Sequence, residues 1–213
     1  MTFHQVYIKL LKQYGCQHWW PADTPFEVMV GAILTQNTAW ANVERAIANL
    51  KSHSCLDPQQ ILATPLPTLA EWLKPSGYFN IKAQRLCNFC RWYVAAGEFS
   101  RLSLLDTKTL RKALLAINGI GPETADDILL YAFARPVFVI DAYTRRIFTR
   151  LQLTKDSAGY ETLRAEFENN LKTDAAVFNE YHALIVRHAK ESCKKRPACA
   201  KCCLGKSCPA SEA

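Results

Sequence analysis

Apolar residues recur along this chain at helical spacing, and no segment alternates apolar and polar positions as a half-exposed strand would. The pattern predicts helices over 3–14, 26–35 and 41–51, two short helices within 57–74, and further helices over 102–117 and 175–192. The only β-branched run, 137–140, is too short to found a sheet. The predicted fold class is therefore all-α.

A second pattern lies within 114–133, where the apolar spacing breaks at N-G-I-G-P and then resumes. Gly119 and Gly121 flank Ile120, and residues without Cβ adopt positive φ and allow close approach of a ligand. Pro122 suits the first turn of a helix, where an amide hydrogen is not needed. Such a turn directs unpaired N–H groups outward at a helix start, which favours binding of a phosphate.

Asp141 follows the apolar segment V-F-V-I and precedes another helical pattern. In the simplest interpretation it is an N-cap and nothing more. A carboxylate at the positive end of a helix also stays ionised, and this suits cleavage of a glycosidic bond. An anion beside the sugar stabilises an oxocarbenium-like transition state and orients the attacking water.

Composition narrows the class of protein. The chain has 213 residues, 49% hydrophobic and 21% charged, which is enough for a substantial core. Its apolar runs are too short for a membrane span, and the first fifteen residues lack a signal-peptide core, so we expect an intracellular, cytoplasmic protein. Lys and Arg outnumber Asp and Glu by 26 to 19, and this net charge of +7 favours an anionic partner.

Nine cysteines are present, and four of them have metal-ligand spacing near the C-terminus. These four are Cys193, Cys199, Cys202 and Cys208. The spacing alone leaves zinc and a [4Fe–4S] cluster equally open, and the adjacent Cys203 could replace Cys202. A separate C-x-x-C, Cys87 and Cys90, lies on a helical pattern and is interpreted as packing.

The paired Trp19 and Trp20 before Pro21, together with Trp40, have two interpretations. They either pack between helices or form an aromatic wall for a flat ligand such as a nucleobase.

The segment I-N-G-I-G-P-E-T-A-D-D-I-L-L-Y-A-F followed by V-I-D-A-Y-T-R-R resembles the helix-hairpin-helix/Gly-Pro-Asp superfamily of DNA base-excision glycosylases, in its endonuclease III branch. The likeness extends from about Trp19 to Cys208. It implies a six-helix lobe over 25–135, which contains the hairpin, and a second lobe made of 1–24 and 136–213. It also implies a monomer associated with the nucleoid, with damaged double-stranded DNA as its partner and no membrane.

The resemblance assigns roles to hairpin and pocket residues. It places the essential aspartate at Asp141, and it implies that hairpin amides from Gly119 to Gly121 hold a DNA phosphate, with a possible bound alkali cation. The W-W-P segment resembles the pocket of the branch that excises 3-methyladenine, which makes Trp19, Trp20 and Pro21 candidate base-binding residues.

Three further DNA contacts follow from the resemblance. Gln36 matches the glutamine that fills the gap left by a flipped base, and Trp40 matches an aromatic residue that stacks on that base. Tyr78 lies in a segment that resembles the family's wedge loop, although it could equally cover a helix end.

One position departs from endonuclease III. The first turn after the hairpin carries Glu123 where that enzyme has the lysine that forms a Schiff base. A carboxylate forms no imine, so we expect a monofunctional glycosylase without lyase activity. Glu123 either contributes to the pocket, as in the 3-methyladenine branch, or complements the helix dipole.

The aromatic faces of Trp19, Trp20 and Trp40 attract cations, and N-alkylated purines carry a positive charge on the base. We therefore expect N-alkylated purines as substrates.

The cysteine spacing resembles the endonuclease III cluster loop, with a first interval one residue shorter, and this favours [4Fe–4S] in a structural role. Lys194 and Arg196 lie in that loop, either against phosphates or as solvated charge. Three other functions stay open: a bifunctional glycosylase/lyase acting on oxidised pyrimidines, a non-catalytic binder of damaged DNA, and a redox protein.

Overall fold

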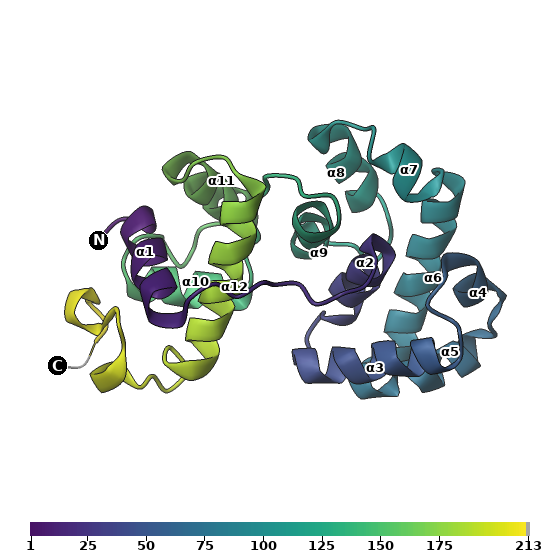
Figure 1. The fold of residues 1–213 in the computed structure, drawn as a ribbon, viewed down its shortest axis with the longest axis horizontal. Coiled ribbons are helices and arrows are strands. Elements are labelled where there is room, and N and C mark those ends of the chain that lie inside the picture. The colour runs from purple at the N-terminus through teal and green to yellow at the C-terminus, as the bar shows by residue number, and fades with distance from the viewer. Residues whose placement is uncertain (212–213) are drawn as a thin grey trace. The chain divides into compact units, whose positions relative to one another are not determined.

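A computed structural model describes residues 1–211 and contains no strand within them (Figure 1). The predicted all-α fold class is confirmed. No helix of these residues is long and apolar enough to cross a membrane. Glu212 and Ala213, at the end of the expected 136–213 lobe, lie outside the described residues.

The chain forms two compact units, Ala22–Phe133 and the combination of Met1–Pro21 with Ala134–Ala213. The first unit contains α2 (Pro25–Leu34), α3 (Trp40–Ser52), α4 (Pro58–Ala63), α5 (Leu66–Leu73), η1 (Lys74–Ser76), α6 (Phe79–Ala95), α7 (Glu98–Leu102), α8 (Thr107–Leu115), α9 (Pro122–Asp127) and the π-helix η2 (Ile128–Ala132). The second contains α1 (Phe3–Tyr14), α10 (Ala142–Arg150), α11 (Tyr160–Asn170), α12 (Ala175–Glu191), η3 (Cys199–Lys201) and η4 (Gly205–Ser207).

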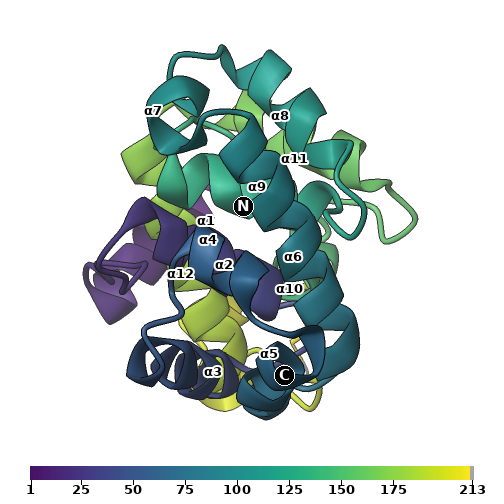
Figure 2. The same ribbon diagram turned by 90° about the vertical axis from the view of Figure 1, so that its right-hand side faces the viewer.

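Helix α2 forms the centre of the Ala22–Phe133 unit. Every residue of it after Pro25 is buried, as expected for a helix that is apolar on nearly all sides. Helix α6 runs the length of this unit, with α7 at one end and α5 at the other (Figure 1, Figure 2). Cys87 and Cys90 are buried free thiols on α6, which confirms that they are packing residues.

Helix starts follow the local sequence rules. The Asp106 side chain accepts from the Thr109 amide and caps α8. Pro122 occupies the first turn of α9, also as predicted. The continuation of α9 into a π-helix was not predicted, because the apolar spacing of I-L-L-Y-A does not distinguish the two kinds of helix.

An aromatic cluster forms the core of the other unit. Its members are Phe3, Phe138, Phe148, Phe167, Phe178 and Tyr181. The Phe138 ring stacks on Phe167 at a centroid distance of 4.2 Å. Since Phe138 lies just before Asp141 in the chain, this packing anchors the segment that presents Asp141.

Candidate functional site

Asp141 is the N-cap of α10, as its position in the sequence predicted. Its backbone is extended, and one carboxylate oxygen accepts from the Thr144 amide at 2.6 Å. The other carboxylate oxygen lies 3.6 Å from Nε2 of His182 on α12. The Asp141 side chain keeps 14% of its surface exposed, so it is largely withdrawn from water while one edge stays accessible.

The surroundings of Asp141 favour its ionised form. Burial by itself raises the pKa of a carboxyl group, but His182 and the Thr144 amide oppose burial and hold the pKa of Asp141 below its ordinary value. The positive end of α10 acts in the same direction. Asp141 is therefore an anion at neutral pH, fixed in one orientation.

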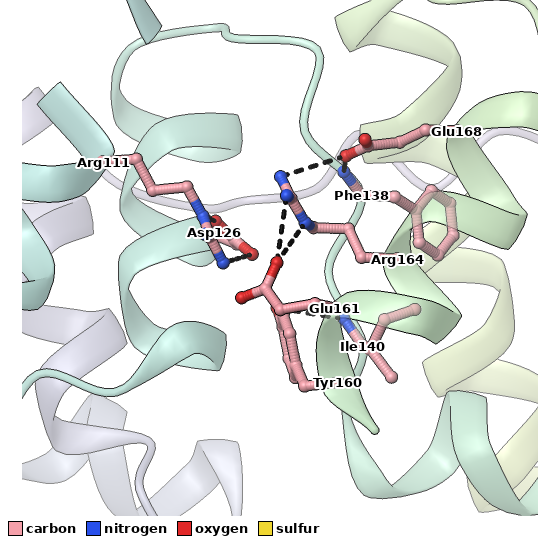
Figure 3. A network of polar contacts seen from close by, with 8 residues as sticks. All are labelled: Arg111, Asp126, Phe138, Ile140, Tyr160, Glu161, Arg164 and Glu168. Carbon is pink, nitrogen blue, oxygen red and sulfur yellow. Dashed lines mark hydrogen bonds and ion pairs between the residues drawn. The ribbon is translucent and has the colours of Figure 1, made fainter. Parts of the chain in front are cut away.

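Helix α11 holds the backbone that leads into Asp141 (Figure 3). The Ile140 amide donates to the Tyr160 hydroxyl at 3.4 Å, and the Phe138 amide donates to a Glu168 carboxylate oxygen at 3.0 Å. Arg164 forms an ion pair with Glu168 at 3.5 Å. These side chains supply the partners that a neighbouring strand would supply in a sheet, which explains how an isolated extended segment stays ordered.

His182 has no metal-ligand spacing, and nothing in the sequence marks it as a functional residue. In the structure it lies next to the Asp141 carboxylate. The contact arises because α12 packs against α10. No local pattern signals it, since the two residues belong to helices that are far apart in the sequence.

The hairpin between α8 and α9 has the expected turn, with one difference. Gly119 takes the positive φ that a glycine in such a turn can adopt, 98°, whereas Gly121 has a φ of −92°, which any residue can adopt. Gly121 is instead the N-cap of α9 and has no capping side chain. A Cβ added there would meet nothing within 4 Å, so the glycine leaves an open surface at the helix start.

Two interactions hold this turn in place on its buried side. Ile120 is buried, with 5% of its surface exposed, so its side chain packs into the interior beneath the turn. Arg111 on α8 forms a two-point ion pair with Asp126 on α9 at 2.6 and 3.1 Å (Figure 3). Because the Asp126 carboxylate is fully buried, this pair holds the two helices that flank the turn in a fixed relation.

Gln36 lies against the hairpin. Its amide nitrogen donates to the Gly119 carbonyl and to the Thr124 hydroxyl, both at 3.0 Å. Its carbonyl oxygen accepts from Arg85 on α6. To fill a gap in a DNA stack, the Gln36 side chain would have to give up these three contacts.

The remaining candidates differ in exposure. Tyr78, the N-cap of α6, has 68% of its surface exposed and left-handed backbone (φ 48°). Glu123 is exposed on the first turn of α9. Trp40 is half-buried at the start of α3 and donates from its indole to Glu44 at 2.8 Å.

Trp19 and Trp20 belong to the other unit. Their rings are half-buried and tilted, with centroids 5.7 Å apart, and Pro21 after them is exposed.

The four predicted metal-ligating cysteines line a single pocket after α12. They are Cys193, Cys199, Cys202 and Cys208, and Cys203 does not line it. Gly205 also lines this pocket, and a Cβ on it would meet the Cys199 carbonyl at 2.9 Å, so the loop closes around the thiols only with glycine there.

Two polar side chains contact these thiols. Arg150 donates to the Cys193 sulfur at 3.3 Å, and His188 Nε2 lies 3.5 Å from the Cys202 sulfur. Within residues 1–211 no three metal-ligating side chains are arranged closely enough to form a metal site as they stand. The donor set around one pocket nevertheless fits a group held by four thiolates. Lys194 and Arg196 are exposed in the same loop.

Comparisons with known proteins agree with this arrangement. Residues 30–173 match the model of the HhH-GPD superfamily base excision DNA repair proteins. The chain is 47% identical to a Methanocaldococcus jannaschii protein that is itself only inferred to be a DNA repair glycosylase, over 96% of this chain and 94% of that protein. It is 29% identical to endonuclease III of Sulfolobus acidocaldarius, over 86% of this chain and 81% of that enzyme.

Among solved structures, the crystal structure of H. pylori 3-methyladenine DNA glycosylase (MagIII) bound to 1,N6-ethenoadenine matches with a TM-score of 0.75 and 27% identity. The match covers 90% of this chain and 98% of that one. The fold and site thus define a helix-hairpin-helix protein of DNA repair. The chain belongs to the HhH-GPD superfamily of base excision DNA repair proteins, and it is a DNA repair glycosylase of that family.

Proposed function

We propose that this protein is a monofunctional DNA glycosylase that hydrolyses the N-glycosidic bond of damaged bases in duplex DNA. The observation that carries the proposal is the Asp141 carboxylate, which is ionised, largely buried and held at a helix start by Thr144 and His182. A fixed anion of this kind stabilises the positive charge that develops on the sugar as the base departs.

We assign the proposed chemistry to two side chains. The accessible edge of Asp141 faces the sugar cation and orients the attacking water, which replaces the base at C1′. His182 is a positioning residue, because its Nε2 lies 3.6 Å from the carboxylate and the nearby ring limits rotation of that group.

The absence of lyase activity rests on Glu123. The first turn of α9 presents a carboxylate where a lysine would be needed to attack the sugar and form an imine. The expected product is an intact abasic site. Borohydride added during the reaction should trap no covalent protein–DNA adduct, and a trapped adduct would favour the alternative, a bifunctional enzyme like the endonuclease III relatives.

The proposed substrates are N-alkylated purines. Their cationic bases are good leaving groups, and the aromatic faces of Trp19, Trp20 and Trp40 attract cations by about 0.5–2 kcal/mol each. The similarity to a 3-methyladenine glycosylase supports the same class. Pro21 and Glu123 are the other proposed base-binding residues.

Base release from duplexes that carry 3-methyladenine, 7-methylguanine, thymine glycol or uracil tests this proposal. We expect release of at least one methylated purine. Release confined to thymine glycol would contradict the substrate class and favour an enzyme for oxidised pyrimidines. Lesion binding without release of any base would instead identify a non-catalytic binder.

The hairpin is the proposed DNA anchor. The open helix start at Gly121, with Gly119 and Ile120, would bind a phosphate near the lesion, together with an alkali cation. Lys194 and Arg196 would add phosphate contacts from the cysteine loop.

The four cysteines of the pocket would hold a [4Fe–4S] cluster in a structural role, since hydrolysis requires no electron transfer. The pocket favours Cys202 over Cys203 as the ligand. Iron analysis and the visible absorption of purified protein test this assignment, and zinc as the only metal would refute it.

A further inference from the structure

Lys82 is a lysine in the interior of the Ala22–Phe133 unit. It lies on the first turns of α6 with 1% of its surface exposed, although lysine is among the residues most rarely buried. Burial and, to a smaller extent, the neighbouring Arg85 together lower the pKa of Lys82 to about 8, so the side chain is mainly cationic at neutral pH. Neither the chemistry at Asp141 nor the hairpin uses this charge.

The ammonium group joins two loops. Its nitrogen donates to the Leu34 carbonyl at 2.8 Å and to the Ser76 carbonyl at 2.6 Å. Leu34 is the last residue of α2 and directly precedes the turn that contains Gln36. Ser76 ends η1 and lies two residues before Tyr78.

Both acceptors are main-chain carbonyls that belong to helix ends, and both residues are fully buried. Terminal helix carbonyls have no partner within their own helix, and a cation is stabilised at this end of the dipole. The short distances are those of charge-assisted hydrogen bonds. Lys82 therefore satisfies two buried carbonyls and fixes the separation of the two loops.

Arg85, one turn further along α6, extends the connection to the hairpin. It donates to the Gln36 carbonyl oxygen, and Gln36 in turn donates to the Gly119 carbonyl. A Cβ on Gly119 would lie 2.3 Å from the Arg85 side chain, so Arg85 also packs directly on the turn. One face of α6 thus contacts the Gln36 turn, the Tyr78 loop and the hairpin.

We propose that Lys82 is a positioning residue for lesion capture, which holds the Tyr78 loop at a fixed distance from the Gln36 turn and the hairpin so that Tyr78 enters the DNA stack where the hairpin grips the backbone. The inference rests on the proposed function, since it takes the Tyr78 loop and the hairpin as DNA contacts. It goes beyond that function in assigning a role to a side chain that DNA cannot touch.

The test measures capture without chemistry. The duplex carries a tetrahydrofuran analogue of an abasic site opposite 2-aminopurine, whose fluorescence rises when it is unstacked. Lys82→Met is compared with Lys108→Met, which removes the same charge from an exposed position on α8. We expect Lys82→Met to weaken binding to this duplex about tenfold, the equivalent of one charge-assisted hydrogen bond, and to reduce the fluorescence rise.

Two further measurements separate positioning from general loss of structure. Binding of Lys82→Met to undamaged duplex should match that of wild type, because the hairpin is intact. In a double-mutant cycle with Tyr78→Ala, the two losses should not add, because Lys82 acts through Tyr78. Additive losses, or an equal loss on undamaged duplex, would overturn the proposal. So would a Tyr78→Ala variant that captures the lesion normally.

This duplex contains no base to release at the abasic position. A wild-type protein that captures it but releases none of the damaged bases would refute the proposed function and leave the role of Lys82 standing. A wild-type protein that releases a damaged base but does not capture this duplex would refute only the role of Lys82.

Discussion

Two helix starts in this protein share one backbone conformation and differ in one side chain. Gly121 before α9 has φ −92° and ψ 178°, and Asp141 before α10 has φ −93° and ψ 178°. At α10 the Asp141 carboxylate accepts from the Thr144 amide and thereby fills the positive helix end with its own charge. At α9 no side chain caps the helix, and the space that a Cβ would enter is open.

The comparison shows that the residue at the N-cap decides what a helix start offers. A glycine leaves the terminal N–H groups and the positive dipole to an external anion, which suits a phosphate. An aspartate uses the same donors to hold a carboxylate, which is then available to a cation. The proposed enzyme needs both, one to grip the DNA backbone and one to stabilise a sugar cation.

The largest effect is expected from Asp141→Asn, which keeps the cap and removes the charge. Asparagine is as good an N-cap as aspartate, so the melting temperature should change little. The single-turnover rate of base release should fall on the order of 10³-fold, as expected when a group that acts on the transition state is lost. Rapid-quench measurement of abasic product checks this, with calorimetry on the same samples. A rate within a factor of about two of wild type would remove Asp141 from the chemistry.

A smaller effect is expected from Gly121→Asp, which gives α9 the N-cap of α10. The backbone of Gly121 is one that any residue adopts, and the site is open, so the protein should fold normally. The new carboxylate would occupy the position proposed for a DNA phosphate at the start of α9. Binding to undamaged duplex should weaken about tenfold. The slope of log affinity against log salt concentration should fall by about one, the equivalent of one released counterion.

Gly121→Ala is the matched control, because it adds a Cβ without charge. Its binding should stay close to that of wild type. Equal losses for the alanine and aspartate variants would show that the space at Gly121, rather than an anion site, matters for DNA.

The sequence predicted the parts of this comparison that depend on neighbouring residues. Asp141 before a helical pattern indicated an N-cap, and Pro122 after the glycines indicated the start of α9. The pattern did not show which glycine takes positive φ, because G-I-G fixes the existence of a turn and not its handedness at each residue. Gly119 takes the positive φ, and the Arg85 side chain also packs where a Cβ at this position would lie.

Contacts between distant segments were not predictable. His182 reaches Asp141 only because α12 packs on α10, and Gln36 reaches the hairpin only because Arg85 and Gly119 lie beside it. Lys82 is a polar residue in a helical stretch, which usually means an exposed position, and only the fold shows it buried against two carbonyls. Periodicity identifies the elements, and tertiary packing selects the partners.

The smallest expected effect is on stability in acid. His182 and the Thr144 amide hold the pKa of Asp141 below its unfolded value despite the opposing effect of burial. The ionised form therefore stabilises the fold above about pH 4, the ordinary value for aspartate, and this contribution is lost as the pH falls through the folded pKa. Asp141→Asn lacks it at every pH. The difference in free energy of unfolding between wild type and Asp141→Asn should accordingly favour wild type more at pH 7 than at pH 3.

Urea unfolding of both proteins at several pH values measures this difference. The two proteins carry the same four cysteines in the pocket, so loss of a bound metal group in acid affects both and cancels in the comparison. A difference that does not change between pH 7 and pH 3 would mean that Asp141 has the same proton affinity in the folded and unfolded chains. In that case the α10 helix start would hold the carboxylate in place without favouring its charge. The two helix starts would then differ only in the side chain present and not in the charge that they stabilise.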